Sequence, residues 1–293
     1  MNSLVEYNLC GNHSVWQQLI SDATNNRIAH AYLFAGPAGI GKATTAKTYI
    51  KYILRADKVL ESRIDKNEFS DLLYISKADK SEITIDSIRM AYNFFNQTAG
   101  EGKYKFVIID DAETLNGNAS NALLKILEEP KPNTYIFLIS NAAYNLIATI
   151  RSRCRIIKFS PLTVNQLQSL PVDINKYSEL QDFIAGSPGK IELCEELDAL
   201  SLFNKLNGLI QDLDILEFNK FTANLAKNDK QWNLVKSLLI FIICQNIKNS
   251  TKKNEALINS FDYIHKIFQE EDVYNLERKQ VLLIALQEIR KNS

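Results

Sequence analysis

A glycine-rich segment near residue 40 has the spacing of a phosphate-binding loop. Residues 36–43 read GPAGIGKA, which fits the pattern G-x-x-x-x-G-K. Glycines in such a loop let backbone N–H groups turn toward a phosphate, and the lysine, here Lys42, reaches the outer phosphates. The next position holds Ala43, where a serine or threonine normally supplies a hydroxyl to Mg²⁺. Thr44 lies about 100° further around a helix, so we expect it to be a poor substitute.

Two acidic residues end an apolar stretch 68 residues after that lysine. The segment FVIIDDAE runs from Phe106 to Glu113 and places Asp110 and Asp111 at the end of a predicted buried strand. Asp110 is placed to reach a metal directly or through water. Asp111 stands where many P-loop ATPases have a glutamate that activates water. The side chain of aspartate is one methylene shorter, so its carboxylate would lie about 1 Å from the working position, and such a misplacement can cost roughly 10²-fold in rate. Glu113 is a weaker candidate for this base, because it lies further into a turn or helix.

A short basic run follows later in the chain. The segment TIRSRC, from Thr149 to Cys154, begins a stretch with four basic residues and no acid: Arg151, Arg153, Arg155 and Lys158. A solvated edge of the fold accounts simply for Arg151 and Arg155. A guanidinium in such a run can instead reach a phosphate on a neighbouring molecule, because its rigid planar fork matches the phosphate oxygens.

The elements that must position these residues are predicted by apolar patterns. Short apolar runs predict strands at 31–35, 72–75, 106–109, 135–139 and 156–159. Helical patterns are found at 42–54, 84–97 and 118–127. Strands that alternate with helices favour a parallel α/β sheet covered on both faces. After Pro161 helical periodicity takes over, with helices predicted near 199–212, 214–227, 230–248, 255–270 and 276–290.

The composition excludes several other kinds of site. The chain has 34 basic and 34 acidic residues, so no global field attracts DNA or an anionic membrane. Its cysteines, at positions 10, 154, 194 and 244, form no close pair, which argues against CxxC zinc or redox chemistry and indicates reduced cytosolic thiols. The start of the sequence does not resemble a secretory signal, and the most apolar stretch, Leu238 to Cys244, is too short to span a membrane. We therefore expect a cytoplasmic protein.

Together, these segments resemble the clamp-loader AAA+ family. HAYLFAGPAGIGKATTAK, TAGEGKYKFVIIDDAETLNGNASNALLKILEEP and TIRSRC have the order and spacing of that family. The resemblance covers residues 9–195 well and the C-terminal region loosely, through NLERKQVLL. GKAT in place of GKTT, and DD in place of DE, make the chain resemble the delta-prime type of DNA polymerase III subunit more than the ATP-hydrolysing gamma/tau type.

The resemblance implies roles for individual residues. An ATP-type nucleotide, with Mg²⁺ if it is bound, would meet the Walker A and Walker B residues, which are Gly36, Pro37, Gly39, Ile40, Gly41, Lys42, Ala43, Thr44, Asp110 and Asp111. Ser140 or Asn141 would take the sensor 1 position, and Lys190 of GSPGK would lie at the start of the sensor 2 helix. Arg153 would be an arginine finger, given in trans to the ATP of an adjacent gamma-type subunit.

The resemblance also implies parts and partners. It predicts a RecA-like AAA+ domain at 1–160, a helical lid at 161–197 and a helical collar at 198–293 that holds a hetero-oligomer together. Gamma/tau and delta subunits would be direct partners, and the sliding clamp and primed DNA would be met through the complex, with no membrane involved. No zinc is expected, because residues 52–71 lack the four-cysteine module of many relatives. Ala148 stands before Thr149, where the family often has proline.

These motifs leave two principal functional interpretations. The first is a subunit without intrinsic catalysis, which contributes Arg153 and binds ATP, if at all, without turnover. The alternative is a gamma/tau-like motor that hydrolyses ATP at its own loop, against which Ala43 and Asp111 argue. A P-loop kinase or GTPase would need substrate motifs that the sequence lacks and has no place for the C-terminal helices.

Overall fold

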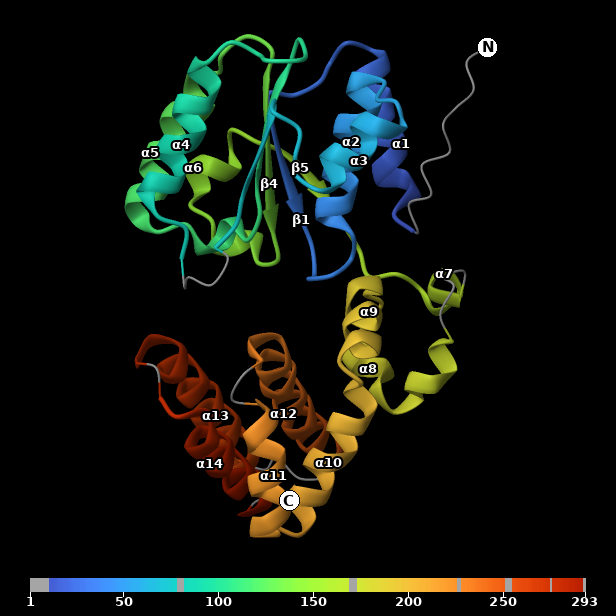
Figure 1. Cartoon of the computed structure of the whole chain (residues 1–293), viewed down its shortest axis with the longest axis vertical. Coiled ribbons are helices and arrows are strands. Elements are labelled where there is room, and N and C mark those ends of the chain that lie inside the picture. The colour runs from blue at the N-terminus through green and yellow to red at the C-terminus, as the bar shows by residue number, and fades with distance from the viewer. Residues whose placement is uncertain are drawn as a thin grey trace. The chain divides into compact units, whose positions relative to one another are not determined.

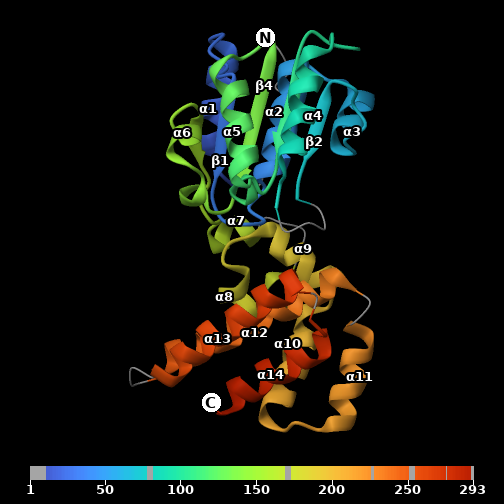
Figure 2. The same cartoon turned by 90° about the vertical axis from the view of Figure 1, so that its left-hand side faces the viewer.

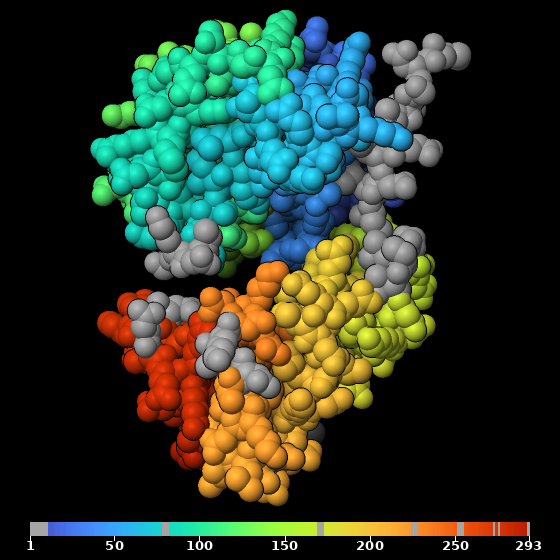
Figure 3. All heavy atoms as spheres, in the orientation of Figure 1, coloured from blue at the N-terminus to red at the C-terminus, as the bar shows by residue number. Residues whose placement is uncertain are grey.

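The computed structural model describes residues 11–77, 82–168, 173–225, 228–250, 255–274 and 276–291. Cys10 and Asn275, the first residue of NLERKQVLL, lie outside this set. The chain forms two compact units, Met1–Ile174 with Ala185–Gly189, and Asn175–Ile184 with Lys190–Ser293. Figure 3 shows the heavy atoms on one face of each unit. Most of the first unit is coloured blue to green, and the long helices of the second unit are orange to red.

The first unit contains a five-stranded parallel sheet. Its strands are β1 (Ala31–Ala35), β2 (Leu72–Ile75), β3 (Lys105–Ile109), β4 (Thr134–Ser140) and β5 (Arg155–Lys158). Their order across the sheet is β2-β3-β4-β1-β5, and every neighbouring pair is parallel. Leu33 at the centre of β1 pairs with Leu138 on one side and Ile156 on the other. The predicted parallel α/β sheet is confirmed, with each strand within one residue of its predicted bounds.

Helices cover both faces of this sheet (Figures 1 and 2). One face carries α1 (His13–Thr24), α2 (Lys42–Leu54) and α3 (Lys58–Asp65). The other carries α4 (Ile85–Asn96), α5 (Gly117–Glu128) and α6 (Ala148–Arg151). β1 sends Tyr32 and Phe34 into the first layer and Ala31 and Leu33 into the second, as the twofold period of a strand requires. Three short turns complete the unit: η1 (Ala112–Thr114), η2 (Ala143–Asn145) and α7 (Val164–Gln168).

Helix α3 was not predicted, because it lacks apolar periodicity. Ile64 is its only residue that the structure describes as fully buried. The helix starts instead from a local cap, since the carboxylate of Asp57 accepts the backbone N–H of Leu60 at 2.8 Å. Such caps satisfy one of the free N–H groups at a helix start and stabilise it by about 1 kcal/mol.

Among the residues described, the regular elements of the second unit are all helices. It contains most of η3 (Ile174–Leu180) and α9 (Pro188–Glu196), and all of α8 (Gln181–Ile184), α10 (Ala199–Gln211), α11 (Ile215–Leu225), α12 (Asp229–Asn249), α13 (Glu255–Tyr274) and α14 (Arg278–Lys291). The five long helices were predicted to within a few residues. α12 is the central one, burying Trp232, Leu238 and Ile243. No helix in the described part of the chain is long and apolar enough to cross a bilayer.

Candidate functional site

The glycine-rich loop connects β1 to α2, and its glycines are required by its geometry. A Cβ on Gly36 would lie 2.5 Å from the backbone oxygen of Phe159, so no other residue fits there. Gly41 has φ 88°, in the left-handed region that favours glycine. Ile40 is buried in the core and anchors the loop between these two glycines. The backbone therefore has the turn that a phosphate cradle needs.

Lys42 is buried and fully hydrogen-bonded within the chain. Its side-chain nitrogen donates to the backbone oxygens of Gly36 at 2.7 Å and Pro37 at 2.6 Å, and to Oδ1 of Asn141 at 2.9 Å. An ammonium has three N–H donors, so these contacts use all of them. Burial lowers the pKa of Lys42, and the nearby carboxylates of Asp110, Glu113 and Asp111 oppose that shift.

Asp110 and Asp111 follow β3, as predicted, and each has a local partner. The carboxylate of Asp110 accepts the hydroxyl of Tyr74 at 2.5 Å and the backbone N–H of Asp111 at 2.9 Å. Asp111 has φ 53°, an uncommon conformation for a residue other than glycine. Burial, followed by the charge of Asp110, raises the pKa of Asp111. Because proteins collect such features at functional positions, the end of β3 is the centre of the candidate site.

Asn141 connects the loop to the acidic residues. Its Oδ1 accepts from Lys42, while its Nδ2 donates to Glu113 Oε1 at 3.0 Å and to Asp111 Oδ1 at 3.3 Å. Its backbone N–H also donates to Glu113 at 3.2 Å. Ser140 is completely buried, and its hydroxyl accepts the backbone N–H of Ala142. Of the two residues at the predicted sensor position, Asn141 is therefore the one whose side chain contacts the site, where it also binds Glu113.

The residues present could hold phosphates better than a metal ion. The loop supplies backbone N–H groups and Lys42, whereas Ala43 presents a methyl group where a metal ligand would be needed. Thr44 is exposed, and the hydroxyl of Thr45 donates to the backbone oxygen of Gly41 at 2.8 Å. Among the described residues no three His, Cys, Asp or Glu side chains are arranged to hold a metal. The side chain of Asp110 is the best-placed ligand if a nucleotide brings Mg²⁺.

The GSPG segment lies against the loop, a contact that sequence reasoning missed. The backbone N–H of Gly189 donates to the oxygen of Gly39 at 2.8 Å, and the hydroxyl of Ser187 donates to the oxygen of Ala38 at 3.0 Å. Lys190 belongs to the second unit, where its ammonium donates to the oxygen of Phe183 at 2.7 Å and lies over that residue's ring. Its role toward a nucleotide stays a prediction.

Arg153 lies on a turn that the core holds in place. Ile150 is completely buried, and Cys154 packs against the core formed by α4, α5 and the sheet. Arg153 itself is partly exposed, with 36% of its side chain accessible, and pairs with Glu128 at 2.8 Å. Arg155 differs, because it pairs at 2.8 Å with the buried carboxylate of Asp22. Arg155 lies on the edge strand β5 with 37% of its side chain exposed, as the sequence suggested, and it also forms an ion pair that the sequence did not indicate.

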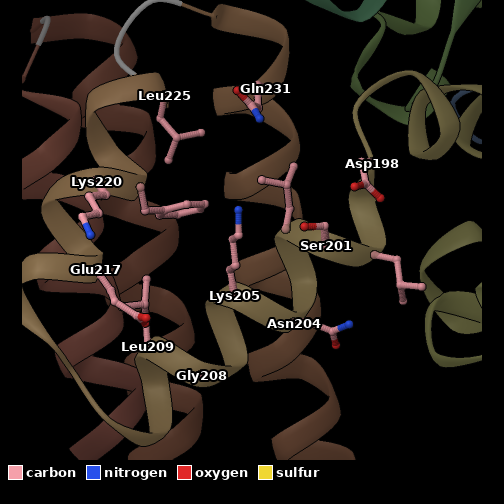
Figure 4. Close-up of a pocket in the computed structure, with 13 residues that line it drawn as sticks. Asp198, Ser201, Asn204, Lys205, Gly208, Leu209, Glu217, Lys220, Leu225 and Gln231 are labelled. Atoms are coloured by element: carbon pink, nitrogen blue, oxygen red, sulfur yellow. The ribbon is translucent and has the colours of Figure 1, made fainter.

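The second unit has a hollow that no sequence motif indicated. It has a volume of about 880 Å³ and lies among α10, α11 and the start of α12. Figure 4 shows Lys205 and Ser201 projecting from α10, with Glu217 and Lys220 on α11. Lys205 and Lys220 are balanced by Asp198 and Glu217, so the lining of the hollow has no excess of positive charge.

The fold and this arrangement define a class of protein. A parallel sheet in this order, a glycine-rich loop after β1 and acids after β3 are those of an AAA+-type P-loop domain, here followed by helices. The family model described as "DNA polymerase III, delta subunit" matches residues 11–163. The chain belongs to the DNA polymerase III delta' subunit family.

Individual relatives agree with this assignment. The delta' subunit of Pseudomonas aeruginosa is 34% identical over 198 residues, which cover 64% of this chain and 57% of that protein. The delta' subunit of Bacillus subtilis is 28% identical over 191 residues, 62% of this chain and 58% of that protein. The matches thus span less than two thirds of either relative. A solved DNA polymerase III gamma subunit-related protein from Thermotoga maritima has the same fold, with a TM-score of 0.63, 19% identity and coverage of 94% of this chain and 99% of that one.

Proposed function

We propose that this chain is a non-catalytic subunit of a DNA polymerase III clamp loader, which assists the ATPase of an adjacent subunit. Its partners would be gamma/tau-type and delta subunits, and the complex would place the sliding clamp on primed DNA. The observation that carries the proposal is the contrast between two cationic residues. Lys42 is buried and bonded to its own loop, whereas Arg153 is partly exposed on a turn anchored in the core.

A partly exposed guanidinium on a turn anchored in the core suits a role in trans. Pre-positioned cations that meet a transferring phosphoryl group stabilise its developing charge without reorganisation. Arginine fingers contribute about 10³–10⁵ in rate in related NTPases, or about 4–7 kcal/mol of barrier. Arg151 is the natural comparison, because it is on the same turn, two residues earlier in the chain.

Substitution of Arg153 tests this proposal in the reconstituted complex. Arg153→Ala should leave the fold and assembly of this chain intact, reduce total ATP hydrolysis in part, and reduce clamp loading further, since loading needs all sites. Arg153→Lys should rescue little, because an ammonium lacks the planar fork. Arg151→Ala is the matched control and should be nearly silent. Normal clamp loading by Arg153→Ala, with a defect in Arg151→Ala, would show that the wrong arginine was chosen; normal loading by both would end the finger proposal.

One observation favours the alternative, a gamma/tau-like ATPase. Asn141 contacts Lys42, Asp111 and Glu113. The side chain of Glu113, one methylene longer than that of Asp111, would therefore be available as a base in the same site. Glu113 would then activate water in place of the usual glutamate. An ATPase assay on the purified chain separates the two candidates.

A further inference from the structure

The guanidinium of Arg153 is held on both of its terminal nitrogens. Nη2 pairs with Oε1 of Glu128 at 2.8 Å. Nη1 donates to the backbone oxygen of Thr149 at 3.0 Å and lies 3.5 Å from the hydroxyl of Ser152. Thr149 and Ser152 are part of the same turn, whereas Glu128 is the last residue of α5. The ion pair thus joins the turn to a separate helix across the surface of the first unit.

Glu128 is an anion at a position where the helix itself disfavours one. The C-terminal end of an α-helix carries partial negative charge, and Glu129 follows directly with a second carboxylate. Arg153 offsets this repulsion, which explains why the two side chains meet. Both are accessible, at 36% for Arg153 and 49% for Glu128, so the pair is weak and readily exchanged.

A phosphate would compete with Glu128 for the same donors. Guanidinium groups bind phosphate most strongly through a fork of two parallel N–H groups. Each such fork includes at least one of the terminal nitrogens, Nη1 or Nη2. Both terminal nitrogens are already engaged in the described conformation, Nη2 by Glu128 and Nη1 by Thr149. Because Glu128 is itself anionic, its presence beside Nη2 also repels an approaching phosphate. A phosphate that binds through Nη2 therefore competes with Glu128 for that nitrogen.

We propose that the Glu128–Arg153 ion pair is an autoinhibitory contact, which keeps the finger on its own chain until the nucleotide of an adjacent subunit displaces the carboxylate. This inference rests on the proposed role of Arg153 in trans. Glu128→Gln removes the competing charge while keeping the size of the side chain. Glu129→Gln is the matched control, because it removes the same charge from the next position.

The experiment measures steady-state ATP hydrolysis by the complex reconstituted with gamma/tau-type and delta subunits. The Arg153-dependent rate is the difference between the complex with the unmodified chain and the one with Arg153→Ala. Glu128→Gln should raise this rate about two- to fivefold, the range expected from releasing an exposed ion pair. The gain should shrink as salt increases, because salt already screens the pair. Glu128→Asp, which keeps the charge but shortens its reach toward Nη2, should give a smaller gain in the same direction and replaces Glu128→Gln if that variant proves unstable.

The outcomes separate this inference from the proposed function. If Arg153→Ala has no effect on hydrolysis, the finger itself is wrong. If Arg153→Ala lowers hydrolysis but Glu128→Gln matches Glu129→Gln, the finger stands and the autoinhibitory contact is overturned. A lower rate in Glu128→Gln also overturns it, because Glu128 would then support the finger. The double variant Glu128→Gln with Arg153→Ala should match Arg153→Ala alone, since the carboxylate acts only through that arginine.

Discussion

Lys42 and its partners decide what the loop of this chain can do to ATP. In a P-loop that binds ATP, the lysine directs its ammonium at the outer phosphates. Here the three N–H groups of the Lys42 ammonium donate instead to Gly36, Pro37 and Asn141. Binding a nucleotide would require these bonds to be exchanged, and the site would still lack the hydroxyl missing at Ala43. A nucleotide bound here would therefore still lack groups that its cleavage needs.

We therefore expect the purified chain to hydrolyse ATP no faster than background. Two groups used by the chemistry are altered, at Ala43 and Asp111, and each loss is expected to lower the rate by orders of magnitude. Phosphate release from the purified chain measures this directly, with Lys42→Ala and Glu113→Gln as controls. Steady turnover that Lys42→Ala abolishes would promote the motor interpretation, and loss of that turnover in Glu113→Gln would identify Glu113 as the base.

Individual elements of the first unit are joined by polar contacts at the end of the sheet away from the site. Asp71 comes just before β2 and is 1% exposed. Its carboxylate accepts the backbone N–H groups of Gly100, Glu101 and Gly102 at 2.7–2.9 Å, and Lys105 approaches it at 3.9 Å. These contacts hold the segment before β3 against the start of β2. Asp110 follows the opposite end of β3, so the two clusters are separate along that strand.

We expect Asp71→Ala to lower the free energy of unfolding by about 3 kcal/mol, because it removes the acceptor of three backbone N–H groups and the counter-charge of the buried Lys105. Denaturant unfolding followed by circular dichroism measures the change. The control is Asp86→Ala, which breaks an exposed pair with Arg89 and should change stability by less than about 0.5 kcal/mol. A similar small effect for both variants would show that the Asp71 contacts contribute little.

The buried residues of the two units come from different segments of the chain, so truncation should affect the two units differently. Both core clusters of the α/β unit consist of residues before position 160. The second unit contains contacts between segments far apart in the chain, such as the ring contact of Phe183 with Phe241. The α/β unit should therefore keep its fold when the C-terminal helices are absent.

Deletion from about residue 205 onward should abolish assembly while the α/β unit stays folded. The deletion removes α11 to α14, which make up most of the proposed collar. These helices carry exposed apolar residues, such as Ile215, Leu216 and Tyr263, through which we expect partners to bind. Co-elution with gamma/tau-type and delta subunits in gel filtration measures assembly, and circular dichroism checks the fold. Arg153→Ala serves as a full-length control that should still assemble. Co-elution of the truncated chain would show that the collar assignment is wrong.

The sequence by itself determined the strands, the glycine-rich loop, the acids after β3 and the long C-terminal helices, because each depends on local periodicity or on residues within one segment. It also indicated Asn141 and Arg153 through resemblance. The tertiary structure alone decided how these residues are engaged. Lys42 meets Asn141 across 99 positions, and Ser187 meets Ala38 across 149. Likewise, the sequence made Glu113 only a weaker candidate for the base, and no local pattern shows that Asn141 holds it, that Arg155 pairs with Asp22, or that Glu128 holds Arg153. These contacts depend on side-chain rotamers and on which segments the packed sheet and helices bring together, and neither is encoded in the spacing of residues along the chain.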